Sequence, residues 1–356
     1  MKITSINAKN FMIFNDINLK FSKDINVISG ANSTGKTALL KLLYASLKGY
    51  DNAYNSMNRT KELVETEIVK KLCGVFRPDK NAVGRLVNRV QGSNRTDLDI
   101  VLDDCNTLEY GFSSRHTAHI DIKNTDFNSF GKVTPVYIPP KEIISATENF
   151  DSLYSDYHIA FEETYDDLTR LLARPLKKGA NSKKKNRVLD RLEKIIDGNI
   201  IQKDRKFYIH VRGEGEFEMG LVSEGYRKLA TIMYLISSGT LSSDSILFWD
   251  EPETNMNPKM IQPIAEAMIE LARMGVQIFV TTHDYFLQQS FNLDAVYSKG
   301  EKNKRKVDYE FISLYKDDEG IIRSEVSKDL SLLEHNDVME EFDAIYNREQ
   351  GMIYGN

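Results

Sequence analysis

The residues best suited to chemistry stand in a glycine-rich loop near the N-terminus. The segment Gly30–Thr37 has the sequence Gly-Ala-Asn-Ser-Thr-Gly-Lys-Thr. Its glycines allow the backbone to curl so that N–H groups point inward at phosphates, and a following helix adds its positive dipole end. In this pattern the lysine reaches the β- and γ-phosphates, and the last hydroxyl binds magnesium. The predicted phosphate-binding residues are Gly30, Ala31, Asn32, Ser33, Thr34, Gly35, Lys36 and Thr37, with Thr37 also a metal ligand.

Two carboxylates directly follow the apolar run Ile246–Trp249. Ligands bind at the carboxyl ends of strands in open α/β sheets. We therefore predict that Asp250 holds Mg²⁺ and that Glu251 polarises an attacking water. The alternative is a strand end whose acids are merely solvated, and the phosphate loop in the same chain disfavours it.

Two further segments carry polar groups at predicted element boundaries. His283 follows the apolar segment 276–280, where an imidazole can sense a γ-phosphate and help to orient water. Ser223 precedes a run with helical spacing and is a good N-cap. A capped helix start is itself a phosphate-binding surface, so the structural and functional interpretations of Ser223 are compatible.

Alternating strands and helices are needed to position these groups. Strands are predicted within 2–29 and, as an antiparallel layer within 97–138, at 98–102, 107–112, 116–122 and 133–138. Helices are predicted over 59–76, 151–173, 187–197 and 335–347, and a hairpin over 207–220. From residue 223 onward, apolar strands alternate with amphipathic helices, which indicates parallel strands covered on both faces. The predicted fold is α/β, with a mostly parallel central sheet, an antiparallel β layer and a small helical insert. We expect a single domain with an N-terminal lobe (1–150), the insert (151–215) and a C-terminal lobe (216–356).

Composition excludes several classes of protein. With 47 Lys and Arg against 52 Asp and Glu, the chain is not a general polycation, so any nucleic-acid contact needs a local basic patch. Two cysteines exclude a disulfide framework and a four-thiolate zinc site within one chain. The sequence shows neither a signal peptide nor a long uninterrupted apolar stretch. We therefore expect a cytoplasmic protein without a membrane span.

Two basic runs offer such a patch. The first lies within 177–187, predicted to be a mobile loop, and the second within 299–306. Each is either a phosphate-backbone contact or a solvated surface loop. The residues concerned are Lys183, Lys184, Lys185 and Arg187, and then Lys302, Lys304, Arg305 and Lys306.

The order of these motifs resembles that of an ABC-type ATPase head of the P-loop NTPase class. It is similar to SMC, RecF and the ATPase half of OLD nucleases. The segments YIPPKE (137–142), SEGYRKLA (223–230), ILFWDEPETNMNP (246–258) and TTHDYF (281–286) also resemble stand-alone bacterial ATPases often found in phage-defence and toxin–antitoxin operons. The resemblance covers most of residues 1–290.

The resemblance implies ATP and Mg²⁺ as cofactors and a homodimer in which two heads sandwich two ATP molecules. Ser223 and Gly225 match the signature that completes the site of the second subunit. Asn257 falls where the loop after the catalytic glutamate usually has an aspartate that touches the opposite site. The chain departs from the transporter signature at Glu224 and Tyr226, where Gly and Gln are usual.

The segment 137–142 occupies the place of a loop that usually offers a glutamine to magnesium. No glutamine is present there, and Glu142 is the candidate substitute.

The resemblance therefore implies an ATPase, with Glu251 and His283 as its catalytic residues. The alternatives are control of a separate effector, a toxin or nuclease, in antiphage defence, or a RecF-like DNA-binding role in repair. The insert is too short for a long coiled coil, and about 70 residues after His283 are too few for a TOPRIM nuclease. We therefore expect the effector to be a separate polypeptide.

Overall fold

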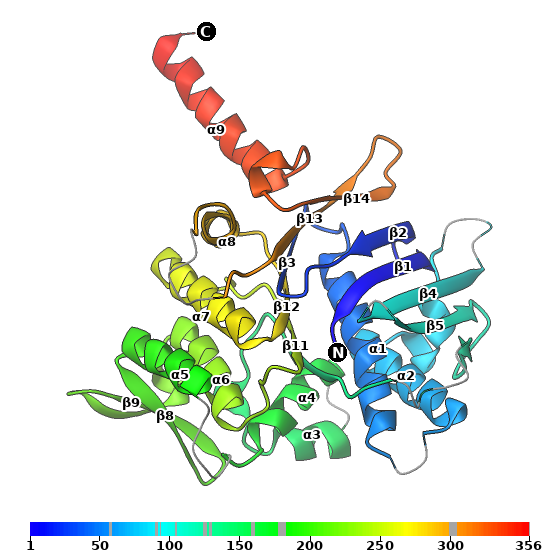
Figure 1. Ribbon diagram of the computed structural model, residues 1–356, viewed down its shortest axis with the longest axis horizontal. Helices are drawn as coiled ribbons and strands as arrows, with labels where there is room; N and C mark the ends of the chain where they lie inside the picture. Colours follow the sequence, from blue (N-terminus) through cyan, green and yellow to red (C-terminus); the bar gives the residue numbers. More distant parts are fainter. Residues whose placement is uncertain are drawn as a thin grey trace.

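The computed structural model describes residues 1–56, 59–89, 92, 94–103, 105–123, 127, 130–157, 161–176, 183–298 and 305–355. For residues 151, 157 and 183–186 it describes the backbone only. Within these ranges the chain folds around a mixed α/β arrangement with three sheets (Figure 1).

The central sheet has six strands in the order β14-β13-β3-β12-β11-β7. Every neighbouring pair is parallel except β13 with β14. This confirms the predicted mostly parallel sheet. The strands are β3 (Ile25–Ser29), β7 (Thr134–Ile138), β11 (Ser245–Asp250), β12 (Gln277–Thr281), β13 (Tyr309–Lys316) and β14 (Ile322–Ser327).

The strands β3, β11 and β12 of the central sheet are buried on both faces, and their successive residues enter different cores. On β11, Phe248 belongs to the core that contains α1 (Lys36–Tyr54) and α2 (Lys61–Phe76), whereas Trp249 belongs to the core that contains α6 (Glu224–Ser237) and α7 (Ile261–Met274). A strand buried on both sides has no polar face, which explains the continuous apolar runs in the sequence.

A five-stranded antiparallel sheet packs into the first core, in the order β2-β1-β4-β5-β6. Its strands are β1 (Ile3–Phe11), β2 (Phe14–Lys20), β4 (Arg95–Leu102), β5 (Asn106–Ser113) and β6 (Asp121–Ile122). The antiparallel layer was predicted, but two of its details were wrong. Only two residues of the segment 116–122 form a strand, and β7 lies in the central sheet beside β11.

The insert differs from its prediction in three ways. The helix expected over 151–173 is two helices, α3 (Phe150–Tyr157) and α4 (Glu163–Leu172). The loop expected to reach residue 187 is wrong from residue 183 onward, because α5 (Lys183–Ile196) begins there; lysine and arginine are good helix formers. The predicted hairpin, β9 (Lys206–Val211) with β10 (Gly215–Glu218), gains a third strand, β8 (Gly198–Lys203).

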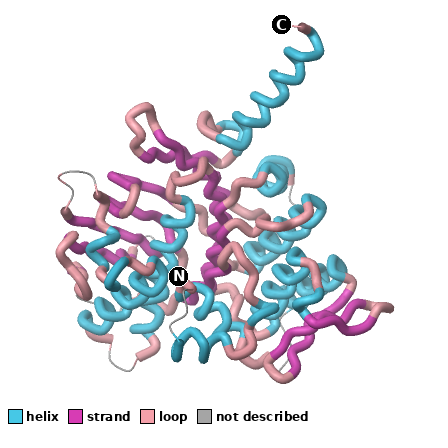
Figure 2. Tube along the Cα trace, turned by 180° about the vertical axis from the view of Figure 1, so that it is seen from behind, coloured by secondary structure: helices cyan, strands magenta, loops and turns pink. Residues whose placement is uncertain are grey.

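The C-terminal helix stands clear of the rest of the molecule. After α8 (Tyr285–Tyr297) and the β13–β14 hairpin, α9 (Asp337–Tyr354) projects from the body, as both ribbon and tube views show (Figures 1 and 2). It starts close to the predicted position and runs longer, ending at Gly355 in the left-handed conformation. Among the described residues, none of the helices is long and apolar enough to span a bilayer.

Candidate functional site

Three central strands bring the predicted motifs to one edge of the sheet. Ile28 on β3 pairs with Thr281 on β12, and Thr281 pairs with Asp250 on β11. These strand ends are therefore level, and the loops that follow them emerge side by side. This is the crevice in which open α/β sheets bind ligands.

The phosphate loop requires glycine at two positions. Gly30 has φ 138°, and a Cβ there would lie 2.0 Å from the carbonyl oxygen of Leu314. Gly35 has φ 97° at the N-cap of α1, and a Cβ there would lie 2.5 Å from the ring of Phe14. Between them, the residues Ala31, Asn32 and Ser33 are exposed, whereas Thr34 is buried. The loop thus has a fixed backbone curl and an accessible outer rim.

Lys36 lies inside this curl, with only 5% of its surface exposed. Its Nζ donates to the carbonyl oxygens of Gly30 at 2.7 Å and Ala31 at 2.9 Å. Burial lowers the pKa of Lys36, and nearby carboxylates, led by Glu251 and Asp337, oppose that change. The ammonium group of Lys36 is therefore held against the first two residues of the phosphate loop.

Asp250 is buried and accepts three hydroxyl hydrogen bonds. Its Oδ1 accepts from Thr37 at 3.0 Å and from Thr281 at 2.6 Å, and its Oδ2 accepts from Tyr137 at 2.9 Å. The structure therefore brings together the two predicted metal ligands, Thr37 and Asp250. Sequence reasoning missed Thr281 and Tyr137, although both belong to the quoted segments TTHDYF and YIPPKE.

The donor set at Asp250 fits magnesium. Hydroxyl and carboxylate oxygens are the ligands that Mg²⁺ takes in phosphate-binding sites, where water and phosphate oxygens complete its shell. In the part of the chain that the structure describes, no cluster of three or more His, Cys, Asp or Glu side chains is arranged to hold a metal ion. A nucleotide-dependent magnesium site does not need such a cluster.

Glu251 and His283 face each other beyond Asp250. Glu251 has φ 45°, and its N–H donates to the carbonyl oxygen of Thr281 at 3.2 Å. Its Oε1 lies 3.6 Å from Nε2 of His283, and its Oε2 accepts from Thr254 at 3.4 Å. Burial and the charge of Lys36 lower the pKa of His283, whereas Glu251 raises it. The lowered pKa favours the neutral imidazole, which lies beside the partly exposed carboxylate of Glu251.

Glu253 connects the two loops and was not singled out in the sequence. Its Oε1 accepts from Oγ1 of Thr282 at 2.7 Å and from the backbone N–H of His283 at 2.8 Å. Burial raises the pKa of Glu253 to about 6. This carboxylate fixes the position of the histidine loop relative to the loop after β11.

Two of the three predicted cross-subunit residues lie on the surface. Ser223 is exposed at the N-cap of α6, and its side chain makes no capping hydrogen bond. Gly225 is buried against Met260, and exposed Asn257 accepts from the N–H of Lys259 at 2.9 Å. Among the described residues, no hydrogen bond joins Ser223 or Asn257 to the phosphate loop of the same chain.

Lys228 anchors the start of α6. It is 1% exposed, and its Nζ donates to the carbonyl oxygens of Pro252 at 3.0 Å and Thr254 at 2.7 Å. Because those residues follow Glu251, one buried lysine holds the signature helix against the catalytic loop.

Glu142 has other partners than the predicted metal ligands. Its carboxylate contacts the guanidinium of Arg227 and accepts from the Ser145 hydroxyl at 2.6 Å. It is therefore committed to α6 and its own loop, and no contact with Thr37 or Asp250 supports the predicted metal role.

A pocket of about 710 Å³ lies beside the phosphate loop, since Ile13 lines it and also lies next to Gly35. Its other lining residues include Asn15, Arg85, Arg89 and Glu319, none of which was singled out.

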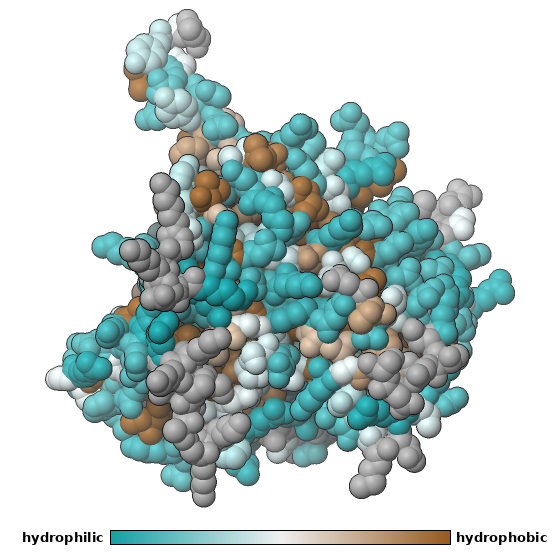
Figure 3. Space-filling model, in the orientation of Figure 1, coloured by the Kyte–Doolittle hydropathy of each residue, from teal (hydrophilic) through white to brown (hydrophobic). Residues whose placement is uncertain are grey.

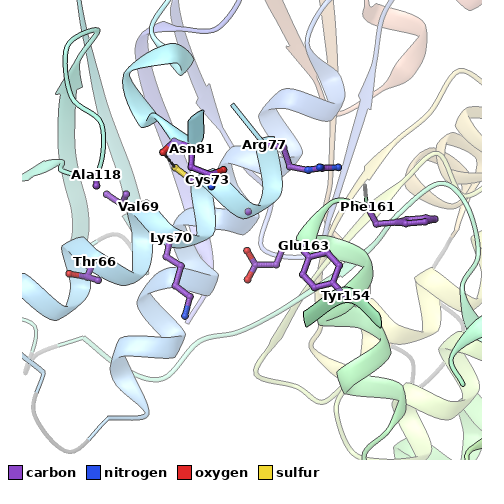
Figure 4. A pocket seen from close by; sticks show the side chains of 11 residues that line it. Thr66, Val69, Lys70, Cys73, Arg77, Asn81, Ala118, Tyr154, Phe161 and Glu163 are labelled. Carbon is purple, nitrogen blue, oxygen red and sulfur yellow. Dashed lines mark hydrogen bonds between the residues drawn. The ribbon is translucent and has the colours of Figure 1, made fainter. Parts of the chain in front are cut away.

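A second pocket, of about 650 Å³, lies between α2 and the α3–α4 segment (Figure 4). None of the predicted site residues lines it.

The basic runs yield little evidence of a patch. Arg187 and Lys306 are exposed, but the side chains of Lys183, Lys184 and Lys185 lie outside the description, as do Lys302 and Lys304 altogether. Arg305 donates to both carboxylate oxygens of Asp24, at 2.9 and 2.7 Å. Its charge is therefore already paired with a carboxylate of the same chain.

Comparisons with known proteins agree with this geometry. A family model described as an AAA domain, putative AbiEii toxin, Type IV TA system, matches residues 111–287, just under half of the chain. This stretch includes the signature residues Ser223 and Gly225, the acids Asp250 and Glu251, and His283, but not the phosphate loop.

Solved SMC heads match over nearly the whole chain. One, bound to the C-terminal winged-helix domain of ScpA, has 12% identity and a TM-score of 0.56, and covers 92% of this chain and 98% of its own. Another, from Pyrococcus furiosus and bound to the C-terminal domain of ScpA, has 12% identity and a TM-score of 0.54, and the match covers 97% of this chain and 99% of that chain. The head from Thermotoga maritima has 11% identity and a TM-score of 0.50, and the match covers 92% of this chain and 98% of that chain.

This chain has the fold of an SMC head. The recognised resemblance to the SMC and toxin–antitoxin group of ATPases is thereby confirmed. At these identities the SMC likeness shows the fold, and together with the family match it supports an ATPase of the AAA, ABC-type and SMC-like kind. Such SMC-like proteins bind nucleotide, usually with Mg²⁺.

Proposed function

We propose that this protein binds and hydrolyses ATP as an SMC-like head that dimerises around the nucleotide and controls a separate effector. The observation that carries the proposal is the meeting of Thr37, Asp250, Glu251 and His283 at one sheet edge, beside Lys36. These groups are the ones that phosphoryl transfer to water requires.

Each residue has a role that follows from its position. The loop N–H groups and Lys36 bind the β- and γ-phosphates, and Thr37 and Asp250 hold magnesium. When bound, magnesium neutralises charge on the phosphate oxygens. Glu251 orients the attacking water and accepts its proton, and neutral His283 offers a hydrogen bond near the γ-phosphate.

The pocket beside the loop is suited to the remainder of the nucleotide. Ile13 and Val87 provide apolar surface, while Asn15, Arg85 and Arg89 provide polar contacts. We assign the base and ribose to this pocket, since its lining residue Ile13 lies next to Gly35 of the phosphate loop.

The dimer is supported by residues that have no role in their own site. Exposed Ser223 and Asn257 lie at the start of α6 and in the loop after β11, and Lys228 holds these two segments together. Gly225 is buried in the first turn of α6. The exposed N-terminus of a helix, with its unpaired backbone N–H groups, binds phosphate. Each subunit offers the start of its α6 to the nucleotide held by the other subunit.

The effector, a toxin or a nuclease in antiphage defence, is supported by the comparisons. The matching family model is described by a toxin and a toxin–antitoxin system, and two similar SMC heads are bound to domains of ScpA. The RecF-like alternative has less support, because the structure describes only three of the basic side chains that it needs: Arg187, Lys306 and Arg305, which is paired with Asp24.

The test compares two variants with wild type in ATP binding, turnover and sedimentation with Mg²⁺. Glu251→Gln should retain binding, lose at least 100-fold in turnover and stabilise the dimer, because the proton acceptor is lost while the phosphate contacts remain. Lys36→Ala should weaken ATP binding at least tenfold. The control is Glu218→Gln, which removes an exposed carboxylate on β10. Normal turnover by Glu251→Gln would reject the assignment of Glu251.

A further inference from the structure

Helix α9 carries an apolar stripe that nothing in the described chain covers beyond its first turns. A spacing of four, three, four and three residues places Val338, Phe342, Ile345, Glu349 and Met352 on one face. Phe342, Ile345 and Met352 are 52%, 56% and 79% exposed. The helix has 18 residues, about 27 Å, and Figure 3 shows it standing clear of the body.

Glu349 interrupts this stripe and Glu341 lies beside it, whereas Glu340 and Asp343 lie on the opposite side of α9. The helix has five acids and one arginine, which gives a net charge of about −4: Asp337, Glu340, Glu341, Asp343 and Glu349 against Arg348. Glu349 lies within the stripe itself. A surface that combines apolar and acidic groups in this way is complementary to apolar residues flanked by Lys or Arg.

The charges argue against two other occupants. A second α9 would bring the same negative charge, and in a parallel pair Glu349 would face its own copy, which is destabilising. A membrane surface rich in anionic lipid would repel the helix for the same reason.

The base of α9 is attached to the candidate site. Asn336 caps α9 and donates from Nδ2 to Oε1 of Gln288 at 2.9 Å, and the ring of Phe342 stacks on Tyr285 at 5.0 Å. Both partners lie in the first turns of α8, which begins two residues after His283. Asp337, the first residue of α9, is close enough that its charge partly opposes the lowering of the pKa of Lys36 and of His283 by burial.

We propose that the stripe formed by Val338, Phe342, Ile345, Glu349 and Met352 is the docking surface for a helix of a partner protein, with an apolar face flanked by Lys and Arg. One of the partner's cations pairs with Glu349. Identification of this partner with the effector rests on the proposed function; the docking surface itself does not, because it lies outside the nucleotide site.

The probe is a synthetic helical peptide with Leu at the seam positions and Lys at the flanking positions. Its twin has Glu in place of each Lys. Fluorescence anisotropy with the full-length protein should show binding of the basic peptide, weaker at raised salt, and no binding of the acidic twin. Ile345→Ser with Met352→Ser should weaken binding at least tenfold. The matched control is Tyr354→Ser, which removes an exposed ring on the opposite side of α9.

Glu349→Lys provides a reversal test. This substitution should weaken binding of the basic peptide and permit binding of the acidic twin. Circular dichroism of each variant checks that α9 is intact, and ATP turnover of the double serine variant should equal that of wild type. This keeps a failure of docking distinct from a failure of the ATPase assignment.

Three results would overturn the proposal. The first is no binding of either peptide to wild type. The second is equal binding of both peptides, or of the double serine variant and Tyr354→Ser. The third is nucleotide-free self-association that the double serine variant abolishes, which would make a second copy the occupant.

Discussion

The buried carboxylate of Glu253 shows how single residues outside the recognised motifs set the properties of the site. It is one of three acids within four residues, and only Asp250 and Glu251 belong to the familiar pattern. Glu253 hydrogen-bonds the histidine loop through Oε1, while its Oε2 is buried without a hydrogen-bond partner in the described structure. A half-satisfied buried acid has a measurable effect on stability.

We predict a pH-dependent stabilisation by Glu253→Gln. Burial raises the pKa of Glu253 from 4.5 to about 6, so the folded chain holds this proton more tightly than the unfolded chain. The contribution of the neutral acid is present below pH 4.5 and is lost as the pH rises through about 6. The cost of the buried charge above that range is about 2 kcal/mol.

Glutamine keeps the acceptor oxygen and removes the charge. The variant should therefore be more stable than wild type by up to about 2 kcal/mol well above pH 6, and the difference should shrink towards pH 4.5. Urea unfolding at several pH values measures this, and His283 titrates in both proteins, so its effect cancels. A difference that is independent of pH would contradict the assigned pKa.

For single residues, sequence reasoning predicted the site groups that belong to contiguous motifs. It missed the groups that reach the site from other strands and loops. Thr37 and Asp250 meet as expected. Tyr137 reaches Asp250 from a strand 113 positions away, and no spacing rule links the two. The predicted metal role of Glu142 has no support, because a short sequence segment does not reveal that Arg227 binds the carboxylate.

Among the elements, α6 and the loop after β11 behave as one unit because Lys228 joins them. We predict that Lys228→Met leaves the carbonyl oxygens of Pro252 and Thr254 without their cation, at a cost of about 1–3 kcal/mol. The ATP-induced dimer should weaken as well, since the helix start would lose its fixed position. Thermal unfolding and sedimentation with ATP measure the two effects.

The control for this prediction is Lys259→Met, which alters an exposed lysine of the same region. It should change neither quantity. If both substitutions behave alike, Lys228 has no special role in positioning α6.

Element boundaries were predictable where periodicity was strong. The parallel core and the strand–loop–helix at residues 25–54 follow from apolar patterns alone. The sheet to which β7 belongs could not be predicted in this way, because a short apolar strand next to antiparallel strands has the same local pattern as one beside β11. Strand pairing is decided by tertiary contacts that the local sequence does not encode.

For the whole molecule, the proposed dimer predicts complementation between two inactive variants. Lys36→Ala destroys a protomer's own loop, and Ser223→Arg blocks the surface that it offers to its partner. In a heterodimer, one site combines an intact Lys36 with an intact Ser223. An equal mixture should regain about a quarter of wild-type turnover, since half of the dimers have one working site of two.

ATPase assays of each variant alone and of the mixture check this prediction. Each alone should be inactive, and Glu218→Gln mixed with Lys36→Ala serves as the control for simple dilution. A mixture as inactive as its components would argue that each site is built within one chain.

The attachment of α9 to α8 also has a mechanical consequence. Because the helix is about 27 Å long and is fixed only at its base, a rotation of 10° there would displace its far end by about 5 Å. A fluorophore placed at the C-terminal tip would report such a rotation as a change in distance to a second dye on the body. The projecting helix therefore amplifies small movements beside His283 into displacements that energy-transfer measurements resolve.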